Sequence, residues 1–287
     1  MVLNNLAAHL VARLCIGLNI NSKIISFGSK FWGMNQITEI NGVGLFVQHE
    51  AKPDTRYTLV FLHDSLGCAV LWRDFPQQLA QKTDCAYLVY DRQGYGQSAP
   101  FGAQPRQQDY MEKEADVLAA LLEQLGIGNA VLFGHSDGGT IALLAAAKYP
   151  EIVVGVVTEG AHVFVEEITL KGIREAVESY QTTNLPEKLA KYHGSKTDGV
   201  FWAWAATWLS EMYRDWNIEH FLPKIQCPVL VIQGENDEFG TLAQVEAIVS
   251  QVSGQAEQLI LPAVGHNPHK EAQAETIEVV AAFLQTF

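Results

Sequence analysis

Short apolar runs bounded by turn residues recur along this chain, and their length is typical of buried strands. The residues from Met34 to Gly42 lead directly into the first run. A chain that supplies so many buried strands is expected to place them in one sheet. The predicted strands are residues 43–49, 57–63, 86–90, 130–134, 153–158, 229–233 and 258–261.

Helical periodicity separates several of these runs. In the first predicted helix, Met111, Leu118 and Leu122 share one face, with acidic residues elsewhere. The predicted helices are residues 109–125, 140–148, 242–252 and 272–284. Alternating strands and helices predict an α/β fold with a mostly parallel central sheet and helices on both faces.

Residues 166–222 interrupt this alternation with helical patterning, no strand signal and many aromatic side chains. Four of the six tryptophans lie here: Trp202, Trp204, Trp208 and Trp216. We interpret the segment as a helical cap inserted between two strands. The body of the single domain is then residues 34–165 and 223–287.

Residues 1–33 differ from the body because they carry Arg13, Lys23 and Lys30 and no acidic residue. Their apolar stretch around residues 10–20 contains Arg13 and is too short to span a bilayer. Three interpretations of this extension stay open: an amphipathic appendage, a targeting segment, or translated upstream sequence before a true start at Met34.

A strand, a sharp turn and the small-residue start of a helix surround Gly134-His-Ser136-Asp-Gly138, which matches G-x-S-x-G. A serine in such a strained turn projects its hydroxyl above the sheet, and its neighbours two residues away must lack bulk. The helix that follows offers free N–H groups to a developing negative charge. We therefore predict that Ser136 is a nucleophile. The alternative is a structural serine in a glycine-rich turn.

A nucleophilic serine needs a base, and the base needs an orienting carboxylate, in the chain order Ser, Asp, His. Asp237 follows the predicted strand 229–233, and we predict it as that carboxylate, with the nearby Glu235 and Glu238 as competitors. His266 lies on the loop after the last strand and is the predicted base, with His269 as its competitor.

Acyl transfer also needs donors for an oxyanion. The amide of Asp137, next to the serine, is one predicted donor. The other is the amide of Ser65 or Leu66, in the loop that follows the strand 57–63. An ordinary strand-to-helix turn is the alternative for this loop.

Four further side chains are predicted to contact the substrate: His63 in the oxyanion loop, His162 just before the cap, and Trp204 and Trp208 within it. Structural packing is the competing interpretation for each of them. The aromatic cap favours an apolar substrate.

The net charge of −13 argues against nucleic acid or an anionic membrane surface as a partner. Because residues 1–33 hold three of the 19 basic residues and no acid, the rest of the chain carries −16. Scattered cysteines predict buried thiols in a reducing cytoplasm rather than disulfides or a zinc site. These cysteines are Cys15, Cys68, Cys85 and Cys227. We expect a small-molecule substrate and no metal or organic cofactor. A homodimer is left open.

Taken together, these residues resemble the α/β-hydrolase superfamily over nearly all of residues 37–287. The segment from Asp91 to Ser98 resembles the D-x-x-G-x-G-x-S turn of that family, and residues 166–222 lie where the family places its cap. The resemblance is to the branch of capped esterases and C–C-bond hydrolases.

The chain departs from that branch at three positions. Asp64 follows His63 where a glycine is usual, Asp137 replaces the methionine that C–C hydrolases carry after the serine, and Asn267 replaces an aromatic residue after the histidine. The resemblance therefore favours ester hydrolysis over C–C cleavage. Serine at position 136 disfavours dehalogenation and epoxide opening, which use an aspartate nucleophile.

The sequence thus predicts a serine hydrolase that acts on a small, apolar carboxylic ester or related carbonyl compound through an acyl-enzyme. The alternatives are a C–C bond hydrolase of vinylogous diketones, and a lyase, perhydrolase or cofactor-free oxygenase on the same triad. A catalytically silent interaction module is the remaining alternative.

Overall fold

The computed structural model of the chain describes residues 33–286 and contains a sheet of eight strands in the order β1-β2-β4-β3-β5-β6-β7-β8. From β4 to β8 neighbouring strands are parallel, whereas β1 and β2 form an antiparallel hairpin at one edge. The strands are β1 (Gly33–Ile40), β2 (Val43–Glu50), β3 (Thr58–Leu62), β4 (Ala86–Tyr90), β5 (Ala130–His135), β6 (Val153–Glu159), β7 (Val229–Gly234) and β8 (Ala256–Leu261). The predicted mostly parallel sheet is confirmed.

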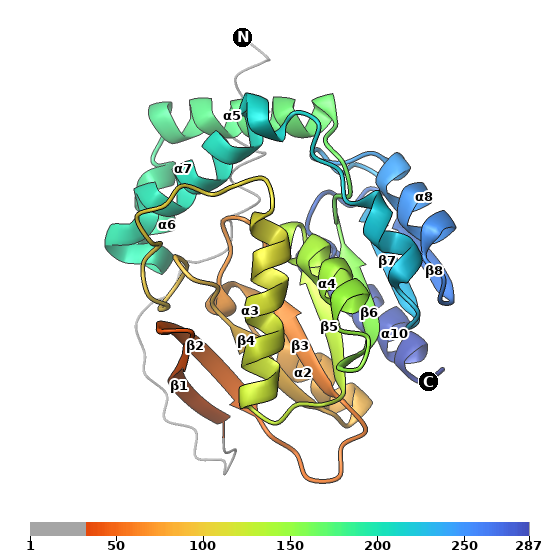
Figure 1. Ribbon diagram of the computed structural model, residues 1–287. Coiled ribbons are helices and arrows are strands. Elements are labelled where there is room, and N and C mark those ends of the chain that lie inside the picture. Colours follow the sequence, from red (N-terminus) through yellow and green to blue (C-terminus); the bar gives the residue numbers. More distant parts are fainter. Residues whose placement is uncertain (1–32, 287) are drawn as a thin grey trace.

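Helices cover both faces of this sheet (Figure 1). They are α2 (Phe75–Thr83), α3 (Tyr110–Gln124), α4 (Asp137–Lys148), α8 (Leu242–Gln251), α9 (Pro268–Glu271) and α10 (Gln273–Leu284). The short helix α2, which carries Pro76 at its second residue, is not among the predicted helices. Helix α4 begins three residues earlier than predicted, directly after Ser136.

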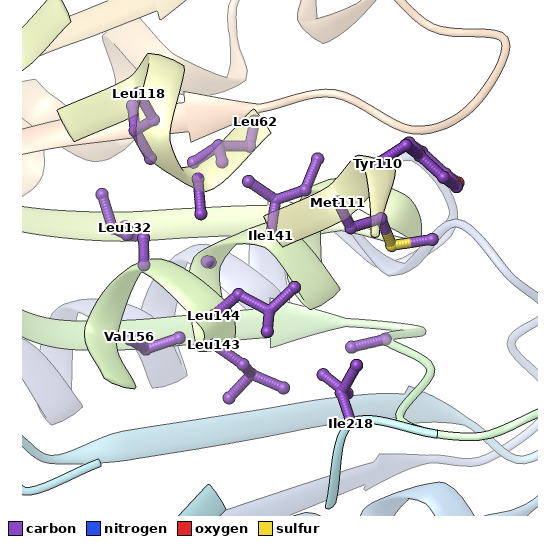
Figure 2. Close-up of a cluster of buried hydrophobic side chains, with 14 of the residues drawn as sticks. Leu62, Tyr110, Met111, Leu118, Leu132, Ile141, Leu143, Leu144, Val156 and Ile218 are labelled. Carbon is purple, nitrogen blue, oxygen red and sulfur yellow. The ribbon is translucent and has the colours of Figure 1, made fainter. Parts of the chain in front are cut away.

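Alternate residues of each central strand pack into two different cores, as the two-residue period of a strand requires. Leu132 and Val156 lie in the core beneath α3 and α4, and Phe133 and Val157 lie in the core beneath α2 and α10. Figure 2 shows part of the first core, in which Ile141 and Leu144 gather in one cluster with Leu118, Leu132 and Val156.

The segment predicted as a cap forms α5 (Glu167–Thr182), α6 (Leu185–His193) and α7 (Thr197–Trp208), which lie together at one end of the sheet (Figure 1). The chain rejoins the body at Ile218, whose amide donates to the Val163 carbonyl at 2.8 Å. No helix between residues 33 and 286 is both long and apolar enough to cross a bilayer. Cys15 and all but the last residue of the predicted extension lie outside the described residues.

Candidate active site

Ser136 occupies the turn between β5 and α4 with backbone angles φ 55° and ψ −121°. A positive φ is strained for any residue other than glycine, and the strain costs about 1–3 kcal/mol. A Cβ on Gly134 would lie 2.2 Å from the Gly138 carbonyl oxygen, and one on Gly138 would lie 2.1 Å from that of Leu62. Both glycines are therefore needed for β5, α4 and β3 to approach closely enough to form this turn.

Asp237 and His266 form a buried pair beside the serine. The Nδ1 atom of His266 lies 2.8 Å from Oδ2 and 2.9 Å from Oδ1 of Asp237. The carboxylate also accepts hydrogen bonds from the amide of Phe239 at 2.8 Å and the side chain of Gln233 at 2.7 Å. These bonds fix the carboxylate, which in turn leaves the second ring nitrogen of His266 free to meet a substrate or the serine.

The two members of this pair shift each other's ionisation. Burial alone would lower the pKa of His266, but the Asp237 charge and hydrogen bond raise it to about 9. Burial would raise the pKa of Asp237, but the neighbouring imidazole lowers it below its usual value. Both directions describe a carboxylate that stabilises an imidazolium.

Gly160, immediately after β6, makes room for this pair and was missed in the sequence. Its φ is +55°, and a Cβ there would lie 2.8 Å from the ring of His266 and 3.2 Å from Oδ2 of Asp237. Its position directly after a strand predicted as buried was the one available signal.

A cavity of about 30 Å³ lies beside Ser136 and His266. Its wall contains Asp64, Ser65, Leu66, Ser136, Asp137, His162, Thr169, Ile173, Trp204, Trp208, Phe239 and His266. The structure therefore brings together the predicted nucleophile, base and oxyanion loop, and three of the four predicted substrate contacts.

The prediction that His63 contacts the substrate needs correction, because this side chain does not line the cavity. Its ring is buried, with Nδ1 2.8 Å from the Asp64 carbonyl oxygen and Nε2 accepting from the Arg92 amide at 3.1 Å. Burial lowers the pKa of His63 well below its usual value. The buried Arg92 guanidinium donates to the carbonyls of His63 and Asp64. Arg92 and the His63 ring therefore support the predicted oxyanion loop from the body of the domain.

The amides of Ser65, Leu66 and Asp137 donate no hydrogen bond within residues 33–286. All three residues border the cavity, as donors for an oxyanion should. The Asp137 side chain accepts a hydrogen bond from the Tyr110 hydroxyl at 2.7 Å. The Asp64 carboxyl is buried, which would raise its pKa, but the neighbouring His135 and Lys270 lower it below its usual value.

The competing triad candidates have other partners. Glu235 is exposed, and Glu238 accepts from the amide of His266 at 3.3 Å. His269 lies on the far side of His135, where its Nδ1 is 2.6 Å from the buried carboxylate of Glu159. Glu159 and His269 therefore form a second pair outside the cavity.

The sequence left open whether the cap tryptophans line the substrate site or pack the cap, and the structure shows both arrangements. Trp204 and Trp208 line the cavity, and Trp208 also packs against Tyr213 and Trp216, so it serves both packing and lining. Trp202 faces outward and is 40% exposed. Among the described residues, no three or more His, Cys, Asp or Glu side chains are grouped to hold a metal ion.

A family model of the alpha/beta hydrolase fold matches residues 57–218. Serine hydrolase BPHL of Homo sapiens is 31% identical over 86% of this chain and 84% of its own length. A 2-hydroxy-6-oxononadienedioate/2-hydroxy-6-oxononatrienedioate hydrolase of Burkholderia vietnamiensis is 26% identical over 69% of this chain and 77% of that protein. The crystal structure of a serine hydrolase involved in carbazole degradation superposes with a TM-score of 0.72 at 19% identity, covering 89% of this chain and all of the other.

Proposed function

Because the chain belongs to the alpha/beta hydrolase fold family, we propose that it is a serine hydrolase in which Ser136, His266 and Asp237 form the catalytic triad. One observation carries the proposal: the strained serine borders the same cavity as His266, whose ring is paired with the buried Asp237 carboxylate. A triad is recognised by such geometry and roles.

In the proposed reaction, the Ser136 oxygen attacks a carbonyl carbon while Nε2 of His266 takes the hydroxyl proton. Asp237 holds the ring tautomer and stabilises the imidazolium. The amides of Asp137 and of Ser65 or Leu66 bind the oxyanion. His266 then gives its proton to the leaving alcohol, and the acyl-enzyme forms. A water molecule, deprotonated by His266, attacks the acyl group and releases the carboxylic acid and free Ser136.

The cavity wall also favours one kind of substrate. Nε2 of His162 donates to the Phe239 carbonyl, 2.9 Å away, so its Nδ1 is an acceptor, and this buried atom has no partner within the described residues. Burial lowers the pKa of His162 and keeps the ring neutral. We therefore infer that the substrate carries a hydrogen-bond donor, such as a hydroxyl group, near its carbonyl.

The charged side chains of the cavity wall disfavour an anionic substrate. Asp64 and Asp137 belong to the wall, and no Lys or Arg lines the cavity among the described residues. The Burkholderia relative is named for hydrolysis of a dicarboxylate. Ester hydrolysis is therefore the preferred activity, and cleavage of such a C–C bond substrate is the alternative.

An activity screen tests this proposal. Short- and long-chain p-nitrophenyl esters, lactones and vinylogous 1,5-diketones are offered to the parent and to a Ser136→Ala variant, with the exposed His220→Gln as a matched control. We expect turnover of small esters by the parent and the control only. If only the diketones are hydrolysed, C–C cleavage rather than ester hydrolysis is the activity. If no compound is hydrolysed, the result contradicts the proposal of a serine hydrolase.

A further inference from the structure

His193, the last residue of α6, connects the cap to the oxyanion loop. Its Nε2 lies 3.0 Å from the Leu66 carbonyl oxygen, and the Gly96 amide lies 3.1 Å from its Nδ1. A carbonyl can only accept and an amide N–H can only donate. The two contacts therefore require a neutral ring with its proton on Nε2.

The two loops that His193 joins are also tied to each other. Asp91, at the end of β4, accepts from the amide of Ala69 at 2.6 Å and from that of Gln97 at 2.7 Å. Lys196, one turn beyond His193, donates to the carbonyl oxygens of Tyr95 and Ser98. The junction of α6 and α7 is thus docked on the loops after β3 and β4.

The contact to Leu66 differs from the others because Leu66 belongs to the wall of the active site. Arg92 holds the beginning of this loop through the carbonyls of His63 and Asp64. His193 holds the following part from the opposite element, the cap. An amide stabilises an oxyanion only when it is held in place before the reaction, and small displacements are costly.

We propose that His193 is a positioning residue that completes the oxyanion hole only when the cap is docked. The proposal rests on the proposed serine hydrolase function. Trp204 and Trp208 of the cap form part of the cavity wall, so displacement of the cap opens the site and breaks the contact to Leu66 at the same time. Release of His193 frees the Leu66 carbonyl, and return of the cap restores the loop around the bound substrate.

The surroundings of His193 keep the ring in the required form. The titratable and charged groups that face it are Asp91, Asp64, Lys196, His63 and Tyr95. Burial lowers the pKa of His193, although the carboxylates of Asp91 and Asp64 oppose this effect. The neutral ring that accepts from Gly96 is therefore the form present at neutral pH.

The test compares two variants. His193→Phe keeps a ring but removes both nitrogens. Lys196→Met removes a neighbouring hydrogen-bond donor between the cap and the body and leaves the contact to Leu66 intact. His193→Gln, whose amide group can both donate and accept, is the conservative variant. We measure kcat and KM for a p-nitrophenyl ester and the inhibition constant of a trifluoromethyl ketone, which forms an oxyanion on the serine.

We expect His193→Phe to lower kcat by about 10- to 100-fold and to raise the inhibition constant of the ketone by a similar factor. These effects are smaller than those expected for the removal of a whole oxyanion donor. Lys196→Met should change mainly KM, and His193→Gln should stay within about threefold of the parent. An unchanged kcat and ketone affinity in His193→Phe, or equal losses in Lys196→Met, would overturn the positioning role.

Nitrogen-15 NMR of the parent keeps the proposal testable if His193→Phe does not fold. The inhibited enzyme should show His193 with its proton on Nε2, and a ring protonated on Nδ1 alone would overturn the proposal. Ser136→Ala separates the two proposals, since undiminished turnover in that variant contradicts the hydrolase function itself. Loss of turnover in Ser136→Ala without any effect of His193→Phe contradicts only the role of His193.

Discussion

The Nδ1 atom of His266 lies 2.8 Å from Oδ2 of Asp237, and both side chains are almost completely buried. The pair joins the loops that follow β7 and β8, and a water-excluded carboxylate at this distance raises the pKa of His266 to about 9. In the proposed reaction His266 is the general base and must be neutral. We therefore expect kcat/KM to rise with pH through the neutral range, to reach half its maximum near pH 9 and to level off above that pH.

Asp237→Asn should lower kcat by about 10⁴-fold, because the ring would lose the partner that fixes its tautomer. The residual activity should show its acid limb at lower pH, since the charge that raises the pKa of His266 is gone. A pH–rate profile of parent and variant measures both effects. If the acid limb of Asp237→Asn lies at the same pH as that of the parent, a group other than His266 controls the profile.

Gly160→Ala should lower kcat by at least about tenfold with little change in secondary structure. The new Cβ would lie 2.8 Å from the ring of His266 in a backbone conformation that disfavours alanine, so the ring has to move. Gly128→Ala is the matched control, because a Cβ there meets nothing within 4 Å. Steady-state kinetics compare the two variants. Equal effects of both would remove Gly160 from the site.

His162→Phe should act on substrate selection rather than on the reaction itself. Removal of the Nδ1 acceptor should raise KM about tenfold for an ester with a hydroxyl group near its carbonyl, the loss expected for one hydrogen bond in a buried site. The matched ester without the hydroxyl should change by less than about threefold. Kinetics on this pair of esters test the role of His162, and parallel changes would contradict it.

Tyr110→Phe should destabilise the protein by about 1–3 kcal/mol, because the buried Asp137 carboxylate would lose its 2.7 Å hydrogen bond. Urea unfolding of parent and variant measures this difference. Tyr149→Phe is the control, since its hydroxyl bonds to Asp116 at the exposed surface. If the two variants unfold alike, the Tyr110 hydrogen bond contributes no more than a surface contact.

The sequence predicted the sheet and the residues at its strand ends because those depend on local spacing. The elbow at Ser136, Asp237 after β7 and His266 after β8 each follow a strand that alternation alone reveals. Helix α2 escaped prediction because it has only nine residues, with a proline at the second and polar residues between its few apolar ones.

The supporting contacts could not be predicted because they join residues far apart in the chain. His193 meets Leu66 across 127 positions, and Glu159 meets His269 across 110. His63 was expected to face the substrate, but the buried Arg92 beneath the loop turns its ring into the body. Such outcomes depend on how loops from different strands are packed together.

Ser136 is the proposed nucleophile, and the proposed function depends on it. The most direct measurement is intact-protein and peptide mass spectrometry after reaction with a fluorophosphonate, alongside ester turnover, for the parent and Ser136→Ala. The parent should carry one phosphonyl adduct on Ser136, and Ser136→Ala should carry none and lose at least about 10³-fold in kcat. Labelling at another residue, or undiminished turnover by Ser136→Ala, would contradict this assignment.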